Sequence, residues 1–123
     1  MATSTAPLKV VAIVASAGGL RAISKVLTDL PASFPATLLV VQHFSPKHRS
    51  LMVDILSRRT ALRVQQAYPE APLLPGTVYI APPDQHLVVN DHHSLSLTPT
   101  EPVHFVRPAA DNLLASVARH YRT

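Results

Sequence analysis

The chain has 123 residues, a formal net charge of +4, 47% hydrophobic residues and 15% charged residues. This length fits one compact domain, and this composition favours a folded protein with an apolar core over a disordered one. The absence of cysteine excludes disulfides, thiolate zinc sites and cysteine nucleophiles. No apolar run approaches the ~20 residues of a membrane helix, and residues 1–9 lack the pattern of a secretory signal, so we expect a cytoplasmic protein without membrane insertion.

The positive charge is dispersed along the chain. Its densest region contains Lys47, His48, Arg49, Arg58 and Arg59, and only three Phe and three Tyr accompany it. This pattern is typical of a solvated helix face, so we expect no nucleic-acid partner. A weakly basic surface still attracts acidic protein partners.

The N-terminal half begins with a flexible segment and a buried strand. Residues 1–8, rich in Ala, Ser and Thr, predict a flexible start, and residues 9–123 predict one domain. Residues 10–15 form a continuous apolar, β-branched run, which is typical of a strand buried on both faces of a parallel sheet. Gly18 and Gly19 then predict a turn.

Two strand-helix units follow one another in the first half of the chain. Residues 37–41 form a second buried strand. Each strand precedes a stripe of apolar residues at helical spacing: Leu20, Ile23 and Leu27 in the first unit, and Leu51, Met52, Ile55 and Leu56 in the second. Ser45 and Pro46 predict the start of the second helix. Consecutive units of this kind require parallel strands with right-handed crossovers, so the predicted class is α/β.

The second half predicts shorter elements. Residues 77–80, 87–89 and 95–97 are short β-like runs, and Asn90-Asp91 is a turn signal between the last two, which predicts a hairpin. A final amphipathic helix is predicted from the stripe of Ala110, Leu113, Leu114, Val117, Ala118 and Tyr121.

Two chemically active side chains follow the two buried strands. Ser16 comes directly after the first strand, and His43 follows the second. Ligands of parallel α/β sheets bind outside the carboxyl ends of the strands, so neighbouring strands would present this hydroxyl and this imidazole together. A histidine that accepts the serine proton makes the hydroxyl a usable nucleophile, and backbone N–H groups after Gly18-Gly19 would hold an oxyanion.

Each of these residues also has a purely structural interpretation. A serine before a helix is commonly an N-cap, and a histidine at a strand end commonly bonds a loop carbonyl. The glycine turn also permits an anion-binding loop, although no Walker or G-x-G-x-x-G pattern is present. The remaining histidines lack the spacing of a metal site, so we expect no metal and no cofactor.

Four ordered segments of this chain together resemble the CheB family of chemotaxis methylesterases. They are residues 14–19 (VASAGG), 40–43 (VVQH), 74–86 (LPGTVYIAPPDQH) and 106–114 (VRPAADNLL). The resemblance implies a three-layer, Rossmann-like α/β sandwich with a mainly parallel central sheet, incomplete here on its C-terminal side. Val14 and Ala17 differ from residues common in the family, which often has Gly and Thr there.

The same resemblance implies hydrolysis of glutamate methyl esters on chemoreceptors, often with glutamine deamidation. It makes Ser16 the nucleophile and His43 the general base. The aspartate of the family's triad lies in a glycine-rich loop after the next strand, which we expect beyond Thr123; Asp84 and Asp111 match other segments. The receiver domain that commonly regulates the family is not part of these 123 residues.

Two further hypotheses stay open. One is a catalytically inactive module that keeps the receptor-binding surface, and the other is an anion-binding regulatory domain built on Gly18-Gly19. For a chain that ends within the sheet, we also expect an exposed apolar edge and association through it.

Overall fold

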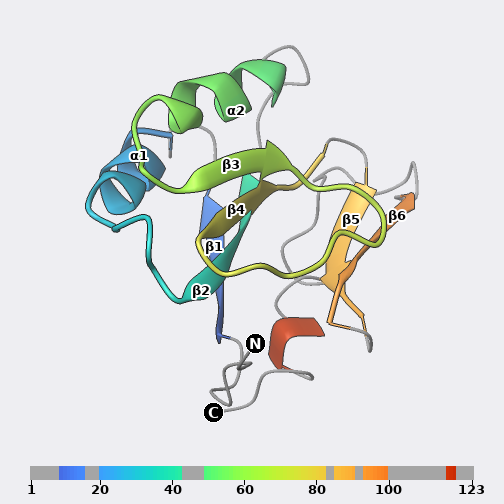
Figure 1. Ribbon diagram of the computed structural model, residues 1–123. Helices are drawn as coiled ribbons and strands as arrows, with labels where there is room; N and C mark the ends of the chain where they lie inside the picture. The colour runs from blue at the N-terminus through green and yellow to red at the C-terminus, as the bar shows by residue number, and fades with distance from the viewer. Residues whose placement is uncertain are drawn as a thin grey trace.

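The computed structural model describes residues 9–15, 20–42, 49–82, 85–90, 93–99 and 116–118. Its centre is a four-stranded sheet with the order β1-β2-β4-β3, in which every pairing is parallel. The strands are β1 (Lys9–Ala15), β2 (Ala36–Gln42), β3 (Arg63–Gln66) and β4 (Thr77–Ile80). Parallel strands joined through helices confirm the α/β class (Figure 1).

Burial differs sharply between the first two strands. Every described side chain of β2 is buried, because β2 lies between β1 and β4. None of the described side chains of β1 is buried, and Val11 and Val14 are 38% and 41% exposed. The prediction of burial on both faces is therefore confirmed for β2 and wrong for β1, which has one partner strand among the described residues.

Two helices cover one face of the sheet. They are α1 (Leu20–Thr28) and α2 (Arg49–Ser57), drawn to the left of the sheet and above it, respectively, in Figure 1. Four members of the predicted stripes are confirmed as core residues, since the core on this face joins helix side chains to alternate residues of β2 and β4: Ile23, Leu27, Met52, Leu56, Leu38, Val40, Val78 and Ile80. Ile55, also predicted in the stripe, is only partly buried and lies outside this core. The predicted capping residues Ser45 and Pro46 lie outside the described residues.

A hairpin covers the opposite face. Its strands are β5 (Gln85–Val89) and β6 (Leu95–Pro99), which pair antiparallel as the sequence predicted. The core on this side joins hairpin residues to the other alternate residues of β2 and β4: Leu87, Val89, Leu95, Leu39, Val41, Tyr79 and Ala81. The sheet thus lies between a helical layer and a hairpin layer, which confirms a three-layer arrangement.

The predicted last helix is described only at residues 116–118, which are helical. Val117 packs against the hairpin core, and the buried Ser116 hydroxyl accepts a hydrogen bond of 3.0 Å from the Val89 N–H. The remainder of that helix lies outside the described residues, as do residues 1–8.

The sequence did not predict β3. Arg63, Gln65 and Gln66 are polar, and this segment has no apolar run or alternation of its own. The strand forms because its backbone bonds to β4 and the residues flanking it: the Arg63 N–H bonds the Gly76 carbonyl, and the Ala67 N–H bonds the Ile80 carbonyl. Backbone pairing with a buried neighbour outweighs weak local preference here.

Candidate active site

The candidate site begins where β1 and β2 end. Their register runs without interruption from Lys9–Ala36 to Ala15–Gln42, so both strands end at the same level of the sheet. Ser16 follows Ala15 directly in the chain, and His43 follows Gln42. Both predicted catalytic residues lie outside the described residues, so the structure defines the ends of the two strands that carry them.

Both connections after these strands lead into helices on the same face of the sheet. The chain enters α1 at Leu20, four residues after Ser16, and α2 at Arg49, six residues after His43. The first N–H groups of a helix have no intrahelical acceptor, so the start of α1 offers donors close in sequence to Ser16. The structure therefore has the predicted elements of the site: the ends of two neighbouring strands, followed in the chain by the start of a helix.

Residues of the third matching segment are partly described. Tyr79 of β4 is fully buried, and its hydroxyl donates a hydrogen bond to the Pro72 carbonyl. Burial raises the pKa of Tyr79 above 10.0, the nearby Tyr68 raises it further, and Arg63 lowers it. The raised pKa keeps this hydroxyl protonated, and its hydrogen bond to Pro72 gives it a structural role. Asp84 lies outside the described residues, as does Asp111 of the fourth segment.

The described part of the chain contains no group of three His, Asp or Glu side chains placed to hold a metal ion. No described helix is long and apolar enough to cross a membrane.

The family model for CheB methylesterase matches residues 11–123. The chain belongs to the CheB methylesterase family. A protein-glutamate methylesterase/protein-glutamine glutaminase of Myxococcus xanthus is 43% identical over 112 residues, which are 91% of this chain and 32% of that protein. The protein-glutamate methylesterase FrzG of Myxococcus xanthus is 39% identical over 115 residues, covering 94% of this chain and 34% of FrzG.

A solved CheB structure confirms the fold. The crystal structure of the Thermotoga maritima CheB methylesterase catalytic domain superposes with a TM-score of 0.86 at 34% identity, covering 94% of this chain and 63% of that domain. The chain thus spans about a third of the length of these curated CheB relatives and under two thirds of that catalytic domain.

Proposed function

We propose that this chain forms part of a protein-glutamate methylesterase in which Ser16 is the nucleophile and His43 the general base. The main support for the proposal is that Ala15 and Gln42 are register partners, so that β1 and β2 end side by side. Membership of the CheB family supplies the reaction class, since the relatives are named as protein-glutamate methylesterases.

Covalent geometry supports a contact between the two side chains. Paired strands lie about 4.8 Å apart, and each Cα lies about 3.8 Å from the next, so the Cα atoms of Ser16 and His43 are at most about 12 Å apart. A serine side chain, a histidine side chain and the hydrogen bond between them span roughly 10 Å, so contact requires the two Cα atoms to lie about 2 Å closer than this upper bound. The register therefore permits the proton transfer that the mechanism needs.

In the proposed reaction, the Ser16 Oγ forms a bond to the ester carbonyl carbon while His43 takes the hydroxyl proton. N–H groups after Gly18 stabilise the oxyanion. Collapse of the tetrahedral intermediate breaks the bond to the methoxy oxygen, which leaves as methanol with the proton from His43. Water then attacks the acyl-serine, His43 accepts its proton, and glutamate is released as Ser16 recovers its own. Deamidation of glutamine follows the same steps with ammonia as the leaving group.

The orienting carboxylate of the triad is proposed to come from a segment beyond Thr123. The relatives are about three times as long as the matched segment, which leaves room for it. A triad that lacks this group loses about 10⁴ in turnover, because the histidine adopts the wrong tautomer. The proposed substrate is a methylated chemoreceptor or a similar methyl-accepting protein, met in the cytoplasm. The competing proposal is a module that binds the receptor without turnover.

Methanol release from methylated receptor tests both proposals. We expect turnover by a chain extended through the aspartate loop, a loss of at least about 10⁴ in kcat on Ser16→Ala in that enzyme, and little change on Ser33→Ala, which alters an exposed turn residue. Full activity of the extended Ser16→Ala enzyme would overturn the nucleophile assignment. Receptor binding by the extended chain without methanol release would favour the inactive module.

A further inference from the structure

A second candidate site lies at the opposite end of the sheet. An open pocket of about 430 Å³, here named the Arg63 pocket, is found where β3 and β4 begin. Its lining residues are Ala32, Ala61, Leu62, Arg63, Pro75, Gly76 and Thr77. Because Ser16 and His43 follow the carboxyl ends of their strands, a ligand in this pocket would leave the proposed catalytic edge free.

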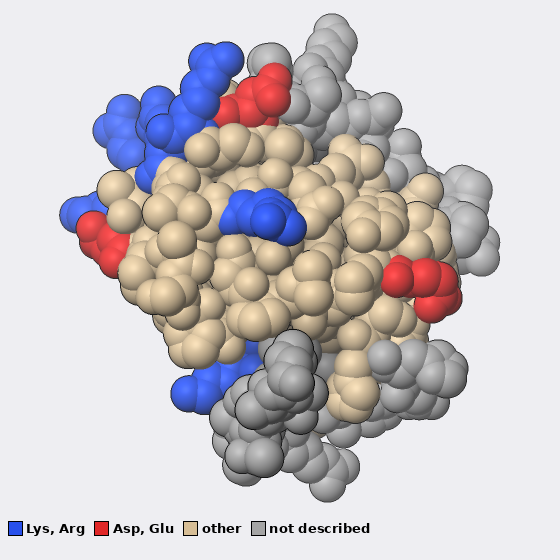
Figure 2. Space-filling view, viewed as in Figure 1, with Lys and Arg blue, Asp and Glu red and all other residues tan. Residues whose placement is uncertain are grey.

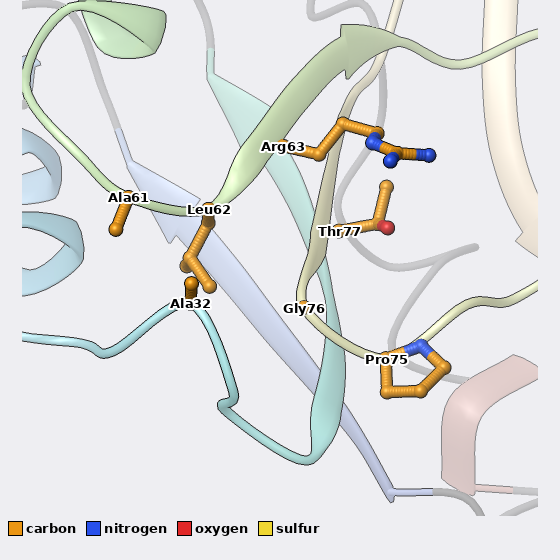
Figure 3. Close-up of a pocket in the computed structure, with 7 residues that line it drawn as sticks. All are labelled: Ala32, Ala61, Leu62, Arg63, Pro75, Gly76 and Thr77. Atoms are coloured by element: carbon orange, nitrogen blue, oxygen red, sulfur yellow. The ribbon is translucent and has the colours of Figure 1, made fainter.

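Two polar groups in the pocket lack partners in the described part of the chain. Arg63 and Thr77 are register partners in β3 and β4, and Figure 3 shows their side chains pointing to the same side. Thr77 is only 2% exposed as a whole residue, and its hydroxyl bonds no described residue; that oxygen is not among the buried unpartnered atoms of the described chain, so it is accessible from the pocket. The exposed Arg63 guanidinium forms no ion pair with the acidic residues that the structure describes. The guanidinium and the hydroxyl are therefore two accessible groups that can donate hydrogen bonds to a ligand in the pocket, and together they are called the donor set.

The donor set favours a carboxylate. The guanidinium fork matches the two oxygens of a carboxylate, and the adjacent hydroxyl can donate a further bond. No acidic side chain lines the pocket, and the whole chain carries a net charge of +4. Electrostatic complementarity therefore selects an anionic ligand.

The surroundings favour a protein over a small molecule. The pocket is more open than the enclosed clefts that bury most of the surface of a small ligand. An exposed apolar side chain adjoins it in the chain: Leu74, 41% exposed, directly precedes the lining residue Pro75. Figure 2 shows a basic area surrounded by uncharged surface near the centre of the viewed face, with both basic and acidic side chains at the margins. Arginine is enriched in binding hot spots.

We propose that the Arg63 pocket binds an acidic side chain of a protein partner, with an apolar neighbour of that side chain packing on Leu74. This inference is independent of the proposed esterase activity.

Titration of the isotope-labelled 123-residue chain by NMR tests the proposal, with the capped tripeptide acetyl-Leu-Glu-Leu-amide as the probe. We expect saturable shifts of the Arg63, Gly76 and Thr77 amides at millimolar peptide. The Gln analogue should bind about tenfold more weakly, because the charge-assisted hydrogen bonds are lost. Acetate and inorganic phosphate should also bind at least tenfold more weakly, because they lack the apolar groups.

Variants assign the binding to the pocket. Arg63→Gln should weaken peptide binding about tenfold, Arg63→Lys should recover part of it, and Thr77→Val should weaken it severalfold. Arg58→Gln removes the same charge from another exposed position and should change nothing. The proposal is overturned if no pocket amide shifts at 20 mM peptide, if the Gln peptide or acetate binds as tightly, or if a folded Arg63→Gln variant binds unchanged. Phosphate binding as tight as peptide binding would indicate a simple anion site and would also overturn it.

Discussion

Ala15 and Gln42 are register partners at the carboxyl ends of two parallel strands, and each directly precedes one residue of the proposed catalytic pair. This pairing relates Ser16 to His43, which lie 27 positions apart in the chain. The interval contains α1 and β2, and the parallel pairing of β2 with β1 aligns the two strand ends.

The shared position predicts that Ser16 and His43 act as one unit. In the extended enzyme, His43→Ala should lower methanol release by at least about 10⁴, and adding Ser16→Ala should lower it little further, because residues of one catalytic unit are strongly non-additive. Single-turnover assays of both single variants and the double variant measure this. Losses that multiply in the double variant would show that the two residues act in separate steps.

We expect the contribution of Tyr79 to the free energy of unfolding to decrease above pH 10. The unfolded chain ionises its tyrosines near pH 10, whereas burial raises the pKa of Tyr79 in the folded state. The resulting stabilisation is complete below pH 10 and is lost as the pH rises from 10 through the folded pKa. Tyr79→Phe removes this effect and the bond to Pro72, so it should cost about 1 kcal/mol at pH 8 and progressively less above pH 10. Urea unfolding between pH 8 and 11 measures the difference.

Tyr68→Phe is the control for that series, because this side chain is largely exposed and its loss should change stability at pH 8 by less than about 0.5 kcal/mol. A difference between the parent chain and Tyr79→Phe that stays constant to pH 11 would contradict the role assigned to Tyr79.

We expect a side chain at position 76 to destabilise the fold. Its φ is +72°, and an added Cβ would lie 3.0 Å from the Ala32 carbonyl oxygen. Gly76→Ala should therefore destabilise the fold by about 1–3 kcal/mol, through backbone strain and this close contact. Ala61→Ser, at an exposed position of the same pocket, should stay within about 0.5 kcal/mol. Equal midpoints of thermal unfolding for the two variants would refute the conformational argument.

The edge of β1 predicts self-association of the 123-residue chain. Among the described strands β1 pairs only with β2, and Val11 and Val14 on it are substantially exposed. An apolar edge strand recruits another chain, and a lysine on it discourages pairing. We expect sedimentation to show concentration-dependent association that Val11→Lys reduces, whereas Val26→Lys, at an exposed position of α1, does not. A monomeric parent chain at high concentration would contradict this prediction.

The spacing of apolar residues was sufficient to predict most helices and strands, because this spacing reflects which side of an element is buried. The runs that became β1 and β2, the helical stripes of Ile23-Leu27 and Met52-Leu56, and the hairpin with its Asn90 turn were all found where the sequence predicted them. Four short segments in order also indicated the family, and a family model that matches residues 11–123 confirmed it. The assignment of Ser16 and His43 to catalysis stays a prediction.

The sequence by itself therefore determined the α/β class, the order along the chain of the described strands and helices other than β3, and the family. The tertiary structure alone decided three things: that β1 lies at an edge of the described sheet, that the polar segment Arg63–Gln66 is a strand, and that Arg63 lies beside Thr77. The physical reason is that side-chain periodicity is local, whereas strand pairing is made by backbone groups that every residue type shares. Which strands become neighbours, and in what register, depends on how the whole core packs.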